Sequence, residues 1–174
     1  MSATLAKPPA KKITRVLVAP GKSRAWGANK NNGVVSYCVH GATGKILASN
    51  FTPSKLIEAL RVGLPMQELA DLQASFAMPA DRLAPMLGIS KATFHRRKGA
   101  DSRLNPAVSD RVVRFARLLG KAVKVFGDIE DAKQWLNSPQ FGLGGAVPLD
   151  YAKTEIGARE VENLLGRIEY GVYS

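Results

Sequence analysis

The chain has 174 residues, of which 45% are hydrophobic, so it is long enough to bury the core of one domain or two small ones. Its formal net charge of +11 and pI of about 10.0 indicate an anionic partner. A single cysteine excludes an internal disulfide and fits a cytoplasmic protein, and no apolar run approaches the roughly 20 residues that span a bilayer.

The positive charge is unevenly distributed. Residues 1–50 hold eight Lys or Arg and no Asp or Glu, residues 51–105 hold eight basic and five acidic residues, and residues 106–174 hold nine of each. We divide the chain at these boundaries into a basic N-terminal extension, a helix-turn-helix region and a C-terminal region. We expect a polyanion to bind the first two regions and a different kind of partner to bind the third.

The N-terminal extension contains short segments rich in β-branched and aliphatic residues. Ile13–Ala19, Val34–Val39 and Ile46–Ala48 are candidate strands, and a Gly- and Asn-rich loop at residues 20–33 separates the first two. The extension therefore holds either short β-strands or a solvated basic tail.

The hydrophobic period becomes helical from Ser54 onward. Ser54–Leu60 and Pro65–Phe76 fit two helices, and Ala80–Lys98 fits a helix, a tight turn at Gly88 and a second helix. This is the pattern of a helix-turn-helix, whose second helix enters the major groove of DNA. The alternative is a helical hairpin with a solvated basic face.

Each part of this motif has a predicted role. Gly88 supplies a positive φ, Ser90 caps the second helix, and Phe94 anchors it in the core, while Leu83, Leu87 and Ile89 hold the two helices together. Pro85 and the position of Arg97 depart from the usual pattern. The predicted DNA contacts are Ser90, Lys91, Thr93, His95, Arg96, Arg97 and Lys98.

A long helix follows, with Asn105 as its N-cap, Pro106 at its first position and Gly127 as its end. Its apolar face comprises Val112, Phe115, Ala116, Leu119, Ala122, Val123 and Phe126. We assign Arg111, Arg114, Arg117, Lys121 and Lys124 to the opposite face, which is either solvated or in contact with phosphates.

The C-terminal region continues with two more helices. Asp128 caps a helix that ends at Asn137-Ser138-Pro139, a Gly-rich loop follows, and the last helix runs from about Thr154 to Tyr170. The aromatic and apolar tail after that helix either folds back on its own domain or contacts a partner.

Enzyme constellations are missing from the sequence. With two histidines and one cysteine there is no zinc cluster, no Ser-His-Asp set is suggested, and Gly142-Leu143-Gly144-Gly145 lacks the lysine that a phosphate-binding loop needs. We therefore predict no enzymatic activity, no cofactor and no metal.

Two stretches of sequence resemble a known family. The first is L-A-P-M-L-G-I-S-K-A-T-F-H-R-R-K with R-L-N-P-A-V-S-D-R-V-V-R-F-A-R; the second runs from F-G-D-I-E-D-A-K-Q-W-L-N-S-P to G-A-R-E-V-E-N-L-L-G-R-I-E-Y-G-V. With its W-L-x-x-P, L-G-G-x-x-P and G-A-x-x-V-E-x-L-L-x-R-I-E-x-G elements, the chain resembles the Xre/MbcA/ParS antitoxins over about residues 55–174. Tyr151-Ala152 departs from this pattern, since many relatives have two leucines there.

The resemblance implies an all-α fold, with an Xre-like helix-turn-helix domain followed by a small helical toxin-binding domain. It implies a homodimeric bacterial antitoxin that represses its own operon by binding operator DNA. It also implies that the C-terminal domain blocks the active site of a RES-domain, NAD-consuming toxin. The alternative is a helix-turn-helix transcriptional regulator without a toxin partner.

The resemblance also places toxin contact on two segments, Trp135–Gly145 and Glu169–Ser174. The toxin-binding residues carried over in this way are Trp135, Phe141, Leu143, Gly144, Glu169, Tyr170, Gly171, Val172, Tyr173 and Ser174.

Overall fold

The structure is a computed structural model, and it describes residues 33–41, 53–97 and 103–172. Contacts divide the chain into residues 1–30 and residues 31–174, so every described residue belongs to the second unit. Within the described ranges the structure is helical and contains no strand, apart from two isolated bridges that pair Pro65 with Arg103 and Gln140 with Ala146. The predicted all-α class is confirmed.

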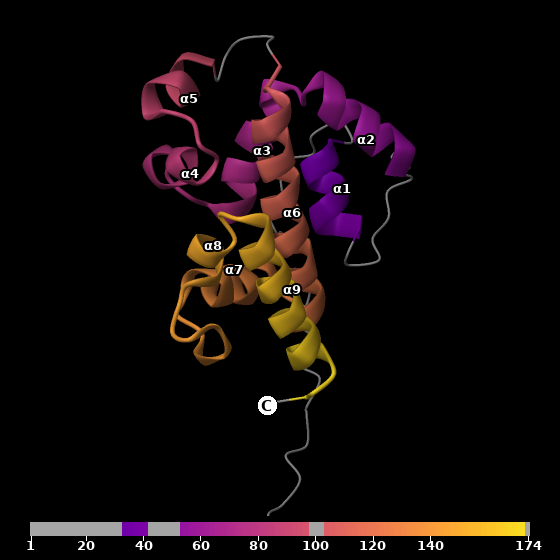
Figure 1. The fold of residues 1–174 in the computed structure, drawn as a ribbon, viewed down its shortest axis with the longest axis vertical. Helices are drawn as coiled ribbons and strands as arrows, with labels where there is room; N and C mark the ends of the chain where they lie inside the picture. Colours follow the sequence, from indigo (N-terminus) through magenta and orange to yellow (C-terminus); the bar gives the residue numbers. More distant parts are fainter. Residues whose placement is uncertain (1–32, 42–52, 98–102, 173–174) are drawn as a thin grey trace, which may run out of the picture. The chain divides into compact units, whose positions relative to one another are not determined.

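The elements follow one another in the order expected for the last two regions (Figure 1). They are α1 (Val34–Gly41), α2 (Pro53–Val62), α3 (Met66–Phe76), α4 (Ala80–Met86), α5 (Lys91–Arg97), α6 (Pro106–Phe126), α7 (Ile129–Asn137), the 3-10 turn η1 (Phe141–Leu143), α8 (Pro148–Tyr151) and α9 (Glu155–Glu169). None of the helices in the described part of the chain is long and apolar enough to cross a membrane.

Helix α6 is the central element, and α1, α3, α7 and α9 all pack against it (Figure 1). Its ends are as predicted: the Asn105 side chain accepts a hydrogen bond from the Val108 amide at 2.8 Å, and Gly127 closes the helix with φ +79°. The predicted apolar face packs in the core, and burial extends beyond it to Val113 and Leu118. A helix that neighbours surround is buried over most of its circumference.

The strand predicted at Val34–Val39 is also wrong, because these residues form α1. Two long-range features favour the helix over its β-branched sequence. The Glu68 carboxylate accepts hydrogen bonds from the Val34 and Val35 amides at 2.7 and 2.9 Å, which satisfies the first turn. Gly120 of α6 lies so close to the Cys38 carbonyl that a β-carbon there would collide with it.

The other two predicted strands, Ile13–Ala19 and Ile46–Ala48, lie outside the described residues.

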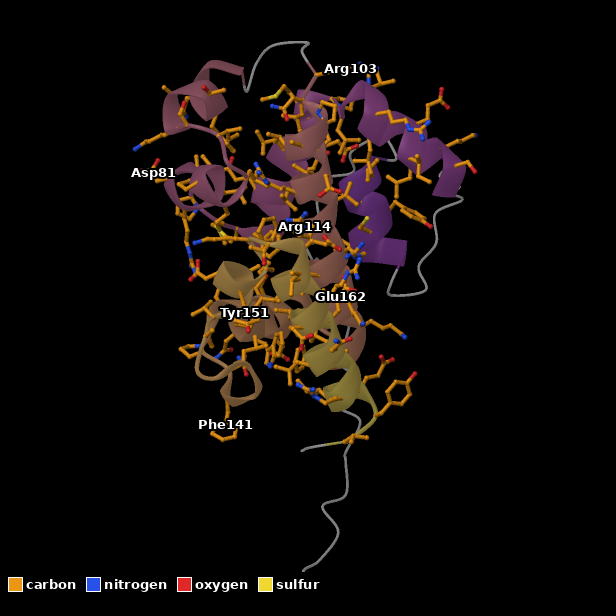
Figure 2. The ribbon with its side chains drawn as sticks, viewed as in Figure 1. Asp81, Arg103, Arg114, Phe141, Tyr151 and Glu162 are labelled. Carbon is orange, nitrogen blue, oxygen red and sulfur yellow. The ribbon has the colours of Figure 1, made fainter. Side chains whose placement is uncertain are left out.

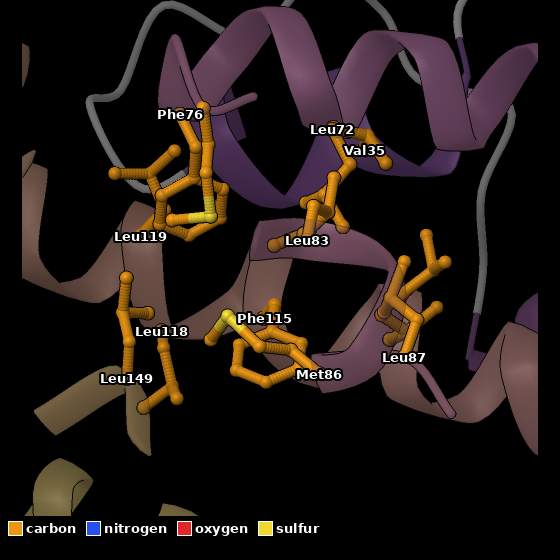
Figure 3. Packing of buried hydrophobic residues seen from close by; sticks show 14 of the residues in the cluster. Val35, Leu72, Phe76, Leu83, Met86, Leu87, Phe115, Leu118, Leu119 and Leu149 are labelled. Carbon is orange, nitrogen blue, oxygen red and sulfur yellow. The ribbon is translucent and has the colours of Figure 1, made fainter. Parts of the chain in front are cut away.

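One hydrophobic core joins the helix-turn-helix region to the C-terminal region. Figure 3 shows Leu83 and Met86 of α4 and Phe115 of α6 near one another, with Leu118 of α6 beside Leu149 of α8. In the C-terminal region Asp128 caps α7, as predicted, by accepting hydrogen bonds from the Glu130 and Asp131 amides. The helix-turn-helix region and the C-terminal region therefore pack around one shared helix, α6.

Candidate functional site

Helices α4 and α5 form the predicted helix-turn-helix. Gly88 in the turn has φ +68°, and the Ile89 amide donates to the Ala84 carbonyl at 3.0 Å. Leu83, Leu87 and Phe94 are almost fully buried between the two helices and α6. The turn chemistry read from the sequence is thus confirmed.

Two of the predicted DNA contacts, Ser90 and Thr93, form hydrogen bonds with each other at the surface. The Ser90 oxygen accepts from the Thr93 amide at 3.0 Å and caps α5, and the Ser90 hydroxyl donates to the Thr93 hydroxyl at 2.8 Å. Both residues stabilise the start of the second helix.

Lys91 has an acidic neighbour that the sequence reading did not consider. Its ammonium group lies 2.6 Å from the carboxylate of Asp81 on α4, and both side chains are about 60% exposed. His95 is exposed, with its ring meeting that of Phe94 edge-on at 5.9 Å between centroids. Arg96 and Arg97 belong to α5, but their side chains and all of Lys98 lie outside the described residues.

The prediction that Arg111 lies opposite the apolar face of α6 is wrong, because its side chain faces α4. It lies one helical turn before Phe115 and so shares that residue's face. Its guanidinium donates to the Leu87 carbonyl at 2.9 Å, at the end of α4. Arg111 therefore closes the turn of the helix-turn-helix.

Three other cations of α6 pair with α9, in a row that we call the ionic seam. Arg114 bonds Glu155 at 2.9 Å, Arg117 bonds Glu162 at 2.6 Å and Lys124 bonds Glu169 at 2.8 Å. The hydrogen bond to Glu169, together with its negative charge, raises the pKa of Lys124. Figure 2 labels Arg114 and Glu162 on the two facing helices.

The sequence predicts that the basic face of α6 is either solvated or in contact with phosphates, whereas three of its cations pair with glutamates of α9 and form the ionic seam. The sequence held a signal for it: the glutamates of α9 are spaced by seven residues, so they share one helix face. Arg117 and Lys124 of α6 are also seven residues apart, which matches the spacing of Glu162 and Glu169.

The Gly-rich loop carries an exposed aromatic side chain. The Gln140 amide donates to the Ala146 carbonyl at 3.0 Å and closes the loop, and Phe141 at its tip is 99% exposed (Figure 2). Trp135 is partly buried against Phe126, at 5.6 Å between ring centroids, and Leu143 packs on the core. Of these predicted contacts, Phe141 is the large apolar side chain that projects into solvent, while Gly144 forms the left-handed end of η1.

The tail begins at a defined helix end. The Gly171 amide donates to the Ile168 carbonyl at 3.2 Å and the Val172 amide to the Arg167 carbonyl at 2.9 Å, with Gly171 at φ +68°. This is the Schellman pattern, which needs a residue that tolerates positive φ. Tyr170 is 81% and Val172 54% exposed, so neither folds back onto the domain. Tyr173 and Ser174 lie outside the described residues.

Loop and tail lie at the same end of the described unit (Figure 1). The loop is held against α9 because Gly142 packs on Leu164, whose side chain would lie 2.7 Å from a β-carbon at that position. Sequence reasoning missed two further exposed side chains in the C-terminal region, Tyr151 on α8 and Ile156 in the first turn of α9, the end of that helix away from the tail. At the departure from the family pattern, Ala152 is fully buried and Tyr151 is exposed.

Two family models match adjoining segments of the chain. Residues 55–117 match the antitoxin Xre-like helix-turn-helix domain, and residues 121–171 match the antitoxin Xre/MbcA/ParS C-terminal toxin-binding domain. The first segment contains α3–α5 and most of α2, and the second contains α7, η1, α8 and α9, while α6 spans the junction and α1 precedes both.

Curated proteins with the name Antitoxin Xre are similar to this chain. The protein from Yersinia enterocolitica is 33% identical over 120 residues, which are 68% of this chain and 81% of that protein. The protein from Photorhabdus laumondii is 34% identical over 116 residues, or 66% and 78% of the two chains. The protein from Pseudomonas putida is 34% identical over 79 residues, or 45% and 50%.

Proposed function

Because the chain belongs to the Xre/MbcA/ParS family of antitoxins, we propose that it neutralises the toxin of its pair with the apolar groups exposed at its C-terminal end. The observation that carries this proposal is the exposure of Phe141, Tyr170 and Val172 at one end of the segment that matches a toxin-binding domain. Exposed aromatic side chains on a fixed scaffold are typical anchors of protein interfaces.

The proposed mechanism is occlusion without chemistry. The partner is a RES-type toxin that consumes NAD, and the tail enters its active-site cleft and blocks substrate entry. This chain then needs no catalytic group. In the described part of the chain, no group of three or more His, Cys, Asp or Glu residues is arranged to hold a metal ion.

The tail and the loop are tested separately. Deletion of residues 170–174 should abolish protection of cells from the toxin and leave DNA binding intact. Phe141→Ala should weaken toxin binding by at least about 30-fold if Phe141 is a hot spot worth about 2 kcal/mol. Ile57→Ala, which removes an exposed apolar side chain from α2, is the matched control and should have no effect. A truncated chain that still protects cells would show that the tail is not the plug.

We also propose that the chain represses its own operon through α5, as a homodimer in the bacterial cytoplasm that binds two operator half-sites. The basic character of α5 and its matched helix-turn-helix domain support this role. Arg96→Ala and Arg97→Ala should each cost about 1–3 kcal/mol of operator affinity if the arginine contacts a base. Unchanged affinity in both variants, or binding that does not weaken with salt, would contradict DNA contact by α5.

The alternative function is a transcriptional regulator without a toxin partner. Purification of the chain together with the product of the adjacent reading frame separates the two functions. A stable complex, followed by mass measurement, would identify the toxin and give the stoichiometry. A homodimer alone on operator DNA would favour the alternative.

A further inference from the structure

The direction in which the tail leaves the domain depends on the last turn of α9. Tyr170 is the residue directly after α9, and its amide donates to the Gly166 carbonyl at 3.1 Å. The Gly171 and Val172 amides bond back to the same turn. If this turn unwinds, the side chains of Tyr170 and Val172 lose their fixed position.

The fully buried part of α9 ends before this turn, in which Ile168 is only partly buried. The buried residues of α9 are Gly157, Ala158, Val161 and Leu165, so the last fully buried one precedes the helix end by four residues. The final residues of a helix leave carbonyls without intrahelical partners, and such ends open most readily. Apolar burial at this turn is therefore incomplete, and a contact with α6 outside the core adds to what holds it.

The last pair of the ionic seam lies at this place. Lys124 is near the end of α6, and its ammonium group lies 2.8 Å from the carboxylate of Glu169, the final residue of α9. Side-chain exposure is 56% for Lys124 and 28% for Glu169, so the carboxylate is the more covered partner. The Glu169 side chain is directed at α6, rather than outward with that of Tyr170.

We propose that Lys124 and Glu169 are positioning residues for toxin recognition, which hold the last turn of α9 so that the tail is presented in a fixed direction. This inference rests on the proposed function of the tail. It also changes the role of Glu169, which the family resemblance assigned to toxin contact and which here acts through Lys124. A tail that is ordered before binding loses less conformational entropy on association.

Charge exchange tests the pair. Lys124→Glu and Glu169→Lys each place like charges together, whereas the double variant restores an opposite pair. Each single variant should weaken binding to the purified product of the adjacent reading frame by about three- to tenfold, and the double variant should recover most of this loss. Glu160→Lys makes the same charge change on α9 at an exposed position on the face opposite Glu169, and it should bind like the wild type.

A second measurement does not involve the toxin. Hydrogen exchange at the Tyr170, Gly171 and Val172 amides should accelerate by about three- to tenfold in each single variant and return toward the wild-type rate in the double variant. Exchange in the middle of α6 should not change, which separates loss of position from loss of fold.

These experiments separate the positioning role of Lys124 and Glu169 from the proposed binding of the toxin. If the wild type does not bind the toxin, the proposed function fails, while the exchange rates still report on the pair. If the wild type binds and Lys124→Glu binds equally well, the positioning role is overturned. If Glu169→Lys remains defective in the double variant while Lys124→Glu alone is harmless, Glu169 contacts the toxin directly, and the inference is wrong.

Discussion

Glu68 is a carboxylate that is buried where α3 meets the start of α1. Burial raises its pKa above the ordinary value of 4.5, the nearby charge of Asp71 adds to this, and the hydrogen bonds from Val34 and Val35 oppose it without cancelling it. The residue therefore stabilises the first turn of α1 while carrying a desolvation penalty in its charged form.

The raised pKa gives stability a defined pH dependence. A carboxyl with a raised folded pKa favours folding most below about pH 4.5, and this contribution is lost as the pH rises through the raised value. Glu68→Gln removes the titration and one of the two hydrogen bonds, at a pH-independent cost of about 0.5–1.5 kcal/mol.

We therefore expect the free energy of unfolding of the wild type, relative to Glu68→Gln, to fall as the pH rises from 4 to 8. Denaturant titrations of both proteins at several pH values would measure this. A difference that is constant over the range would contradict it.

Residue-scale features were predictable when they were local. Asn105, Asp128 and Gly127 are caps whose roles depend on residues within a few positions, and all three were read correctly. The hydrogen bonds of Glu68 to Val34 and Val35 span more than 30 residues, so no local pattern contains them.

At the scale of elements, α4 and α5 place an acidic group on the surface that is expected to face DNA. Asp81 pairs with Lys91, and an exposed ion pair of this kind contributes little stability. The Asp81 carboxylate repels phosphates, and it pairs with Lys91, which is one of the predicted DNA contacts.

Asp81→Asn should therefore raise operator affinity by about two- to fivefold and steepen the salt dependence by about one phosphate contact. Titrations of operator DNA at several salt concentrations would show both effects. Asp150→Asn is the control, since Asp150 on α8 forms a comparable exposed pair with Lys153. Weaker binding by Asp81→Asn would show that the pair positions Lys91 for DNA.

Element prediction failed where neighbours decide the structure. The β-branched residues of Val34–Val39 favour a strand, but a short segment that packs on α6 and has its first turn capped becomes a helix. Gly120 is part of the reason, since it lets the Cys38 carbonyl approach the α6 backbone. The burial of α6 beyond its predicted apolar face has the same cause. A helical wheel of α6 alone contains no information about α1, which packs against it.

At the scale of the whole described unit, α6 belongs to both functional regions. The core continues from α4 through α6 to α8, and the ionic seam joins α6 to α9. We expect residues 33–172 to unfold in one cooperative transition, although two family models divide them.

In a Trp26→Phe background, Trp135 reports on the C-terminal region by fluorescence, and far-ultraviolet circular dichroism reports on all helices. Both signals should show the same denaturation midpoint. A Trp135 transition at lower denaturant would show that the C-terminal region unfolds separately.

The two-region order was predictable at this scale from charge and motif, but the connection between the regions was not. This connection matters for any attempt to move the proposed toxin specificity from this chain to a related antitoxin. A graft of residues 127–172 onto another antitoxin would set Glu155, Glu162 and Glu169 against whatever side chains the recipient's long helix carries. A recipient with acidic residues at those positions would repel the three glutamates, and the grafted helix would not pack in its native position. On the proposed function, a transfer of toxin specificity therefore requires the C-terminal segment together with Arg114, Arg117 and Lys124.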